Sequence, residues 1–376
     1  MKFKIFMNHL SRNGGAEIIA IDGAKMLAKK GHRVSICVPR NQVEESLLND
    51  LNKSGVSVIY IEMKNFTHLG EHKNICQKIY DQIFDIVNFN LRGFIRNNVE
   101  KSDYVIVHKM RSLSPLLFKL LHENGNDFVY CMHDYELFNF NAKKVGGVTG
   151  LIYFYLFRRY FLKFINKICC PSNFMKSEVE SFFNEEKIYV LSNFISGNFF
   201  CQDNKKYDVA FFGRLEQIKG IEFFCKTVSM SERKTLIVGS GSLEKKLKKQ
   251  FKNFQNIEFL GNLSHNSTIN LMGQCKVVVV PSLWAEPFGL VAAEAAMCGS
   301  YLLLSDQGAL PEVLNNVGGY GELIDKQSII QCSVFLNVLE RIFISGVLDK
   351  KTDIKNTYNI DFYYKNLIGI INESQS

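Results

Sequence analysis

The segment from Val277 to Gly299 has the residue types of a ligand site that follows a buried strand. It opens with an apolar run, continues through a loop, and then becomes an alanine-rich stretch with helical character. The backbone amides of a helix's first turn have no partner within the helix. The amides around Phe288, Gly289 and Leu290 could therefore receive phosphate or sugar oxygens.

Two carboxylates flank these amides. We expect Glu286 in the mouth of a cleft and Glu294 about two turns into the helix, and Gly289 between them leaves room for a ligand. This separation suits two parts of one long ligand better than a paired acid and base. Two structural alternatives stay open: Glu286 could compensate the helix dipole, and Glu294 could be a surface charge.

A second segment, Phe211 to Gly220, places Arg214 and Lys219 five residues apart after a strand, with Gly213 at the turn. Two fixed cations can stabilise the negative charge that grows on a diphosphate leaving group. The alternative is a surface turn with two solvated basic side chains, which is the usual position of Arg and Lys.

Two further segments follow strands in the first half of the chain. Gly14 and Gly15 lie between the first strand and the first helix, where glycine allows a tight turn and close approach of a ligand. His133, with Asp134 after it, ends another apolar run. A lone histidine at a strand end is more often a structural residue than a functional one.

Together these segments resemble the large family-four class of retaining glycosyltransferases with the GT-B fold. The hallmark of that family is a glutamate, then Phe or Tyr with Gly, then a second glutamate eight residues after the first. Glu286, Phe288, Gly289 and Glu294 match it. The resemblance implies that Glu286 hydrogen-bonds the donor sugar, that Glu294 holds the ribose hydroxyls, and that the backbone of residues 288–290 faces sugar and phosphate.

The resemblance also assigns roles to the other segments. Arg214 and Lys219 match the family's phosphate-binding pair, and His133 matches a histidine that touches the donor sugar, with Asp134 as its orienting partner. The turn containing Gly239 resembles the glycine turn near the nucleotide. The implied catalytic residues are Glu286, His133, Arg214 and Lys219; the implied donor-binding residues are Gly14, Gly15, Gly213, Gly239, Phe288, Gly289, Leu290 and Glu294.

The length of 376 residues exceeds what one hydrophobic core usually supports. Apolar runs alternate with helix-like segments, a pattern typical of parallel βαβ units. We therefore predict an α/β protein with two Rossmann-like, doubly wound domains that face each other across a cleft. The first, acceptor-binding domain covers residues 1–195, with a helix over 355–372 packing back on it, and the donor-binding domain covers 205–352.

The strand predictions are specific. In the first half they fall at Phe3 to Met7, Arg33 to Val38, Val56 to Ile61, Tyr104 to His108, Phe128 to His133 and Lys167 to Pro171. In the second half they fall at Tyr207 to Phe212, Thr235 to Val238, Asn256 to Phe259, Val277 to Val280 and Tyr301 to Leu304.

The sequence gives little sign of a metal or another cofactor. It contains no Asp-x-Asp and no Cys-x-x-Cys, so we expect leaving-group stabilisation without a metal. The N-terminal residues form a strand pattern without the features of a signal peptide, which predicts a cytoplasmic protein. We expect a nucleotide-sugar donor, a saccharide or lipid-linked saccharide acceptor, and no nucleic-acid partner.

The net charge is +8, and residues 143–168 contain six basic and no acidic residues around an aromatic run. This run is shorter than the ~20 residues that span a bilayer, but it could rest on an anionic membrane surface. A buried helix with a solvated basic edge explains it equally well. Membrane contact would place the protein on the inner face of the cell membrane.

The resulting hypothesis is a retaining glycosyltransferase of the hexosyltransferase type. It would act on a lipid-linked oligosaccharide in the synthesis of a bacterial surface polysaccharide. Two alternatives are a nucleotide-sugar epimerase of the same fold and a binding subunit without catalysis.

Overall fold

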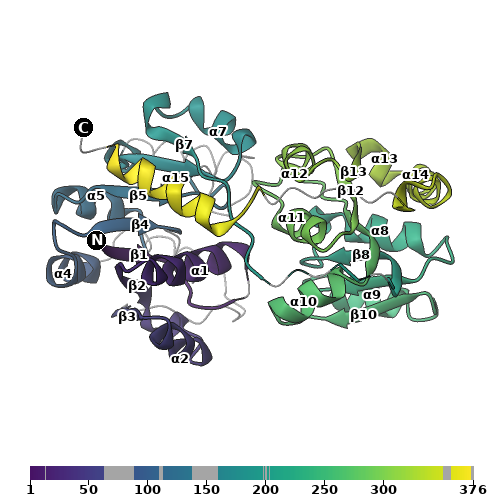
Figure 1. The fold of residues 1–376 in the computed structure, drawn as a ribbon, viewed down its shortest axis with the longest axis horizontal. Helices are drawn as coiled ribbons and strands as arrows, with labels where there is room; N and C mark the ends of the chain where they lie inside the picture. The colour runs from purple at the N-terminus through teal and green to yellow at the C-terminus, as the bar shows by residue number, and fades with distance from the viewer. Residues whose placement is uncertain are drawn as a thin grey trace, which may run out of the picture. The chain divides into compact units, whose positions relative to one another are not determined.

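A computed structural model describes residues 1–12, 14–62, 89–109, 113–137, 160–197, 199, 201–202, 204–349 and 357–373. The chain forms two compact units, each with its own parallel sheet (Figure 1). The first unit comprises Met1–Pro171, Lys176–Phe194 and Ile360–Ser376, and the second comprises Ser172–Met175 and Ile195–Asn359. The expectation of an α/β chain with two doubly wound sheets is confirmed.

The first unit has a seven-stranded sheet in the order β3-β2-β1-β4-β5-β6-β7. Every strand pair is parallel, as strands joined by crossover helices must be. The strands are β1 Lys2–Phe6, β2 Arg33–Pro39, β3 Val56–Ile61, β4 Tyr104–Val107, β5 Phe128–Cys131, β6 Lys167–Cys170 and β7 Ile188–Val190. Six agree with the predictions to within two residues at each end, and only β7, three residues at the sheet edge, was missed.

Helices cover this sheet, and one face packs against α1, α2 and α15. The α-helices in these segments are α1 Gly15–Lys29, α2 Ser46–Lys53, α4 Phe89–Asn98, α5 Leu116–Glu123, α7 Asn173–Glu180 and α15 Ile360–Asn372. Short 3₁₀ turns are η1 Arg40–Gln42, η2 Leu162–Phe164 and η3 Glu185–Lys187. The C-terminal helix α15, yellow in Figure 1, lies beside α1, and its buried face, which includes Tyr363 and Leu367, belongs to the first unit's core.

The second unit has a six-stranded parallel sheet in the order β10-β9-β8-β11-β12-β13. The strands are β8 Tyr207–Phe212, β9 Thr235–Val238, β10 Ile257–Gly261, β11 Cys275–Val280, β12 Tyr301–Ser305 and β13 Gly321–Ile324. Only β13 was not predicted. It is a four-residue edge strand with one buried residue, so it lacks the apolar run that identifies the others.

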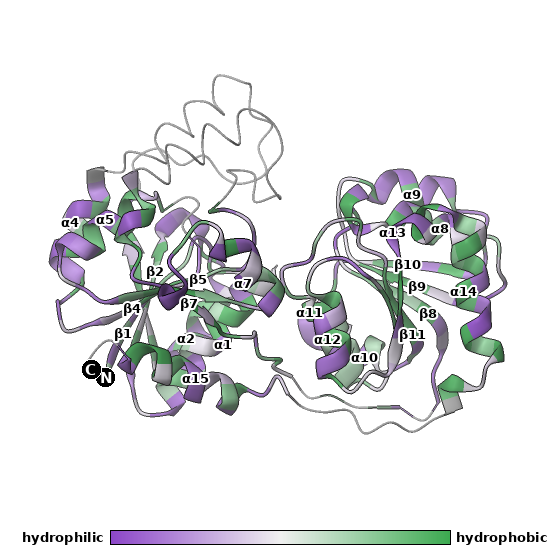
Figure 2. Cartoon of the chain, turned by 90° about the horizontal axis from the view of Figure 1, so that it is seen from above, coloured by the Kyte–Doolittle hydropathy of each residue, from purple (hydrophilic) through white to green (hydrophobic). Residues whose placement is uncertain are grey.

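Both faces of this second sheet are buried. Odd-numbered residues of β11 such as Val277 and Val279 join one core cluster, and even-numbered residues such as Val278 and Val280 join the other. Figure 2 shows α8, α9, α13 and α14 on one side of the strands and α10, α11 and α12 on the other. A strand buried on both faces has a continuous apolar sequence, which explains the valine run of β11.

The helices of the second unit are short. They are η4 Gln217–Lys219, α8 Ile221–Val228, α9 Glu244–Gln250, α10 His265–Met272, α11 Leu290–Met297, α12 Leu310–Asn316, α13 Lys326–Ile330, α14 Cys332–Ile344 and η5 Val347–Asp349.

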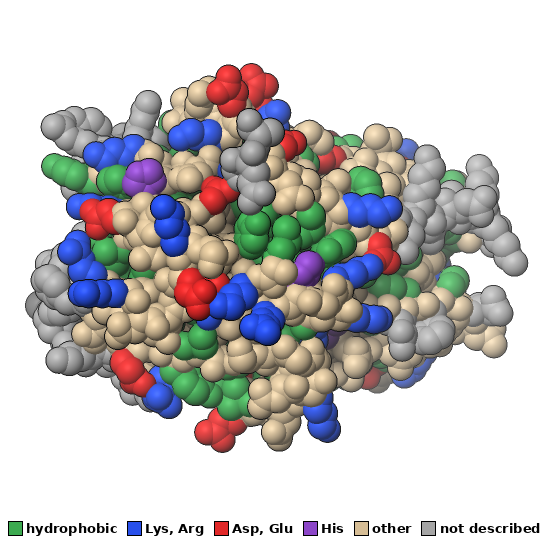
Figure 3. Space-filling view, turned by 60° about the vertical axis from the view of Figure 1, so that its left-hand side comes forward, with side chains coloured by type: hydrophobic (Ala, Val, Ile, Leu, Met, Phe, Trp, Pro, Cys, Tyr) green, Lys and Arg blue, Asp and Glu red, His purple; other side chains and the backbone are tan. Residues whose placement is uncertain are grey.

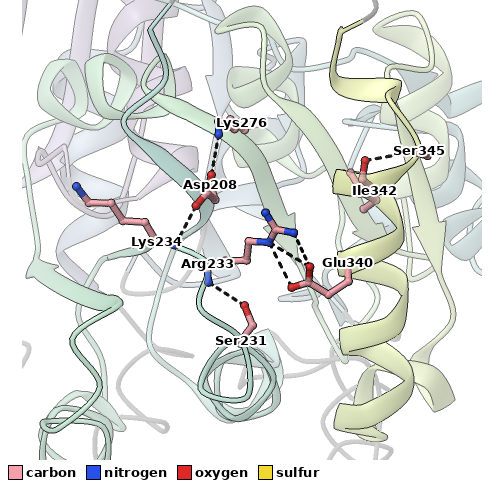
Figure 4. A network of polar contacts seen from close by, with 8 residues as sticks. All are labelled: Asp208, Ser231, Arg233, Lys234, Lys276, Glu340, Ile342 and Ser345. Atoms are coloured by element: carbon pink, nitrogen blue, oxygen red, sulfur yellow. Dashed lines mark hydrogen bonds and ion pairs between the residues drawn. The ribbon is translucent and has the colours of Figure 1, made fainter.

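A polar network fixes α14 beside the amino ends of the central strands (Figure 4). The guanidinium of Arg233 binds Glu340 of α14 at 2.5 Å and lies over the ring of Phe343. Asp208 accepts from the backbone amide of Lys234 at 3.0 Å and from Lys276 Nζ at 2.8 Å. These charges lie at the end of the sheet opposite to the carboxyl ends, so they stabilise the unit without entering the candidate site.

The basic aromatic segment 143–168 lies mostly outside the described residues, so the predicted membrane contact stays a prediction. Of its basic residues, Lys163 is exposed, but Lys167 is buried and therefore does not belong to a basic surface. Acidic and basic side chains are interspersed over the face drawn in Figure 3. No helix in the described ranges is long and apolar enough to cross a membrane.

Lys167 instead holds the C-terminal helix. Its Nζ donates to the carbonyl oxygens of Ile370 at 2.6 Å and Ile371 at 3.2 Å, and Asp127 lies 3.4 Å away. The last carbonyls of a helix have no partner within the helix, and a cation at that end also interacts favourably with the helix dipole.

Replacing this side chain should loosen α15. Lys167→Met removes the Nζ donor from the carbonyls of Ile370 and Ile371, which costs about 1 to 3 kcal/mol. We expect amide hydrogen exchange in Ile360–Asn372 to accelerate roughly 5- to 100-fold, measured by mass spectrometry. Lys163→Met, the same change at an exposed neighbour, serves as the control. Equal exchange in both variants would show that Lys167 does not hold the helix.

Candidate functional site

The candidate site of the second unit lies where its sheet changes winding direction. The chain moves outward from β8 to β9 and β10 on one side, and from β11 to β12 and β13 on the other. In open α/β sheets, ligands bind beyond the carboxyl ends of the strands at this switch point. The loop after β8 contains residues 213–220 and the loop after β11 contains residues 281–289, so the two segments selected from the sequence are neighbours.

An ion pair joins these two loops. Lys219 Nζ lies 2.7 Å from Glu286 Oε1, and their side chains are only 18% and 9% exposed. The same carboxylate oxygen accepts from the hydroxyl of Ser282. Lys219 also lies 5.1 Å from the ring centroid of Trp284, a cation–π geometry. Glu286 is thus held by a cation and a hydroxyl, which keep its carboxylate in one orientation.

Glycine allows the two loops to approach this closely. Gly220 has a φ of 71°, and a Cβ atom there would lie 1.9 Å from the carbonyl oxygen of Pro281. The backbone amide of Leu283 donates to the carbonyl of Ile218 at 2.8 Å. Any side chain at Gly220 would separate the loops and with them the Lys219–Glu286 pair.

Arg214, the other predicted cation, has a different environment. Its side chain is 61% exposed, and its guanidinium binds Glu216 at 2.9 Å. No contact joins it to Lys219 or Glu286 in the described part of the chain. The structure therefore brings Lys219 to the carboxylate, while Arg214 remains a surface side chain on the same loop.

Gly213 and Gly239, the two predicted glycine turns, lie against each other. A Cβ atom on Gly239 would be 1.9 Å from the carbonyl oxygen of Gly213, and both residues have positive φ. The amide of Gly213 donates to the carbonyl of Val238 at 3.0 Å. The backbones after β8 and β9 are thus in direct contact beside the switch point.

The helix α11 begins at Leu290, after Gly289 in the left-handed region with a φ of 102°. A Cβ atom on Gly289 would meet the end of the Leu310 side chain at 2.6 Å, and the left-handed backbone conformation itself favours glycine. The side chain of Phe288 is buried, with its ring against Tyr358, and only its backbone is available to a ligand. Leu290 is partly buried against the same core.

Glu294 is the fifth residue of α11, about one turn from its start rather than the predicted two, because Pro287 to Gly289 belong to the loop. Its side chain is 7% exposed, which rules out the surface-charge alternative. His265 Nε2 lies 2.7 Å from Glu294 Oε1. His265 was not predicted, because its contact with Glu294 joins residues 29 positions apart and the Ser264 cap before it marks only a helix start.

In the first unit, Lys109 connects the two predicted segments. It follows β4, next to β1 at the switch point of that sheet. Its Nζ lies 3.2 Å from Asp134 and 3.9 Å from Glu17 of α1. Burial alone would lower the pKa of Lys109, but Asp134, Glu17 and Glu136 outweigh it and raise the pKa.

Gly14 and Gly15 open α1 in this unit. Gly14 is the N-cap residue in an extended conformation, and α1 starts at Gly15. A Cβ atom on Gly14 would lie 2.3 Å from a carboxylate oxygen of Glu17, which occupies the space that a side chain would need. Gly14 therefore leaves room for the Glu17 carboxylate at the start of the helix.

His133 pairs with a second histidine that the sequence analysis did not select. His108 Nδ1 lies 2.8 Å from His133 Nε2, and the rings stack at 5.1 Å. Burial lowers the pKa of His108 to about 4. Burial is the main cause that holds the pKa of His133 well below its usual range, and the nearby His108 and Lys109 lower this pKa further.

The expected orienting partner, Asp134, has other contacts. Its carboxylate accepts from the backbone amide of Glu136 at 3.0 Å and pairs with Lys109. The described contacts of the His133 ring are instead with His108. Because Nε2 of His133 is occupied by this bond, Nδ1 is its remaining ring nitrogen for another partner.

Nothing in the described ranges resembles a metal site. No group of three or more His, Cys, Asp or Glu side chains is placed there to hold a metal ion.

Two family models match the chain. The description "Glycosyltransferase Family 4" matches residues 13–197, and "Glycosyl transferases group 1" matches residues 200–333.

Curated relatives agree with these models. The chain is 26% identical over 344 residues to an "uncharacterized 42.6 kDa protein in cps region" of Klebsiella pneumoniae, covering 84% of this chain and 88% of that one. It is 26% identical over 242 residues to the phosphatidylinositol N-acetylglucosaminyltransferase gpi3 subunit of Schizosaccharomyces pombe. That match covers 60% of this chain but only 52% of the yeast protein.

Solved structures support the fold. The chain is similar to Anabaena Alr3699/HepE in complex with UDP and glucose, with a TM-score of 0.70. The identity is 16%, and the match covers 100% of this chain and 98% of the other.

The histidine pair should be neutral over the physiological pH range. With a pKa of about 4, His108 should keep its Cε1–H resonance unchanged between about pH 8 and pH 5.5, as should His133. The unfolded chain takes up these protons near pH 6.5, so the free energy of unfolding should fall as the pH drops below that value. Selective histidine labelling makes the Cε1–H resonances of both rings observable across this pH range.

The variants His108→Gln and His133→Gln assign the two resonances. A titration midpoint near 6.5 for either ring would contradict the buried, neutral pair.

Proposed function

We propose, because the chain belongs to the family 4 and group 1 glycosyltransferases with the GT-B fold, that it moves a sugar from a nucleoside diphosphate sugar to an acceptor hydroxyl with retention of the anomeric configuration. The observation that carries this proposal is the Lys219–Glu286 pair at the switch point of the second sheet. It combines a cation for phosphate with a carboxylate for sugar hydroxyls.

Lys219 supplies the electrostatic part of the reaction. When the bond between the anomeric carbon and the diphosphate breaks, negative charge grows on the phosphate oxygens. A fixed cation in a largely buried site stabilises that charge without reorganising. Lys219 is already positioned by its ion pair with Glu286, and the hydroxyl of Ser282 donates to the same carboxylate. The backbone amides at the start of α11 follow directly on this loop.

Glu286 has the role of a hydrogen-bond acceptor for the donor sugar. One of its oxygens is occupied by Lys219 and Ser282, which leaves the other to accept from sugar hydroxyls. In this proposal the leaving phosphate takes the proton of the attacking hydroxyl, so no enzyme carboxylate acts as a nucleophile. Catalysis then depends on orientation and electrostatics and needs no metal.

The donor and acceptor classes rest on the relatives. The UDP and glucose of the Anabaena structure support a nucleoside diphosphate hexose. The phosphatidylinositol in the name of the yeast relative supports a lipid-linked acceptor, and the cps region of the Klebsiella relative supports a surface polysaccharide. The roles of Gly14, Gly15 and His133 in the first unit stay predictions.

The direct test is release of nucleoside diphosphate from UDP, GDP and ADP sugars, with and without membrane lipid extract, in the presence of a chelator. Release that requires one donor and the extract, and that survives chelation, supports the proposal. Conversion of the donor to its epimer without an acceptor would favour the epimerase. Binding of a donor without any release would favour a non-catalytic subunit. The anomeric configuration of the product follows from its NMR coupling constants.

Neutralising the central carboxylate should abolish most activity. We expect Glu286→Gln to lower kcat by roughly 10² to 10³-fold, because the amide no longer holds Lys219 or accepts strongly from the sugar. Steady-state release of nucleoside diphosphate measures this. Glu232→Gln, the same change at an exposed position of the second unit, is the matched control.

Because Glu286→Gln leaves Lys219 largely buried without its charged partner, we expect the variant to lose thermal stability. The double variant Lys219→Met/Glu286→Gln removes both charges and should recover thermal stability while remaining inactive. Wild-type kcat in a folded Glu286→Gln enzyme would refute the role of this carboxylate.

A further inference from the structure

The carboxylate of Glu294 is buried and depends on one side chain from another helix. Glu294 lies in the middle of α11, among alanines that pack on the sheet. Within the described part of the chain, His265 is the side chain that bonds to it, at 2.7 Å. The two residues are 29 positions apart in sequence, and their side chains are 12% and 7% exposed.

A buried carboxylate without hydrogen bonds is strongly unfavourable. A carboxylate has about four lone-pair positions, and His265 satisfies one of them. The bond between His265 Nε2 and Oε1 fixes the rotation of the group. Its second oxygen, Oε2, is left for a ligand with hydroxyl donors.

His265 is itself held in place. It is the first residue of α10, and the N-cap hydroxyl of Ser264 accepts from the amide of Ser267 at 3.3 Å. Ile269 and Met272, four and seven residues further along the same face of α10, are buried in the core cluster that also contains the alanines of α11. The ring therefore approaches Glu294 from a rigid neighbouring element.

We propose that His265 is a positioning residue that orients the Glu294 carboxylate toward the ribose hydroxyls of the nucleotide, and that it thereby gives the site its preference for ribonucleotides. This inference rests on the proposed function, in which Glu294 holds the ribose. It adds a residue that touches no substrate and acts only through Glu294. A carboxylate locked in one orientation can accept from ribose hydroxyls without first losing rotational freedom.

The energetic signature follows from the distance between the ribose and the reacting bond. An interaction with the ribose is the same in the ground state and in the transition state, so its loss should raise the donor KM and leave kcat nearly unchanged. It should also reduce discrimination against nucleotides that lack the hydroxyls. A purely structural role for His265 would weaken binding of both nucleotide types equally.

The experiment measures binding of UDP, GDP and ADP and of their 2′,3′-dideoxy forms to the full chain by calorimetry. We expect wild type to prefer one ribonucleotide over its dideoxy form by roughly tenfold or more, the size expected for hydrogen bonds to a charged group. In His265→Ala this preference should fall to less than about threefold, because the carboxylate is no longer oriented. His265→Gln, whose amide can replace Nε2–H, should restore it.

Asn266→Ala, at the exposed neighbouring position, is the control and should bind as wild type does. If His265→Ala does not fold, His265→Asn replaces it, since its amide stops short of Glu294 and should give the same loss of preference. A variant that binds both nucleotide types more weakly, with the preference intact, overturns the inference alone. Wild type that binds none of the three nucleotides overturns the proposed function and this inference with it.

Discussion

Parallel pairing of strands is the constraint on which the rest of this structure depends. Parallel strands require crossover connections, and all of their carboxyl ends then meet at one edge of the sheet. Where the winding direction changes, the two central loops leave toward opposite sides and a crevice opens between them. In the second unit those loops follow β8 and β11, and in the first unit they follow β1 and β4. Lys219, Glu286 and Lys109 all lie in such loops, although long stretches of sequence separate them.

Burial of the polar side chains then determines how they are arranged. A largely buried charge needs a partner, and each charged residue of the candidate site has one. Lys219 is paired with Glu286, Glu294 with His265, and Lys109 with Asp134. Such pairs contribute little to stability, because the loss of hydration offsets most of the attraction. Their value lies in fixed orientation, which a catalytic or binding group needs before its ligand arrives.

The sequence predicted the sheets well because a buried parallel strand has a distinct local pattern. The limits of β3 and β8 agree with the prediction at both ends, while the short edge strands β7 and β13 gave no apolar run. The partners of the site residues were harder to predict. His108 is 25 residues from His133, and His265 is 29 residues from Glu294, so neither contact has a local signal. Lys167 was assigned to a basic surface because its contacts with Ile370 and Ile371 are more than 200 residues distant in sequence.

The two cations of the loop after β8 have different environments and therefore different roles. Lys219 has lost most of its hydration, and its position is fixed by Glu286 and Trp284. Arg214 is exposed and, among the described residues, is paired with Glu216. Exposed ion pairs contribute about 0 to 1 kcal/mol, so this bond can be exchanged for a phosphate at little cost. Under the proposed function, Lys219 would supply a preformed charge. Arg214 would supply a planar, bidentate donor that can follow the diphosphate as it leaves.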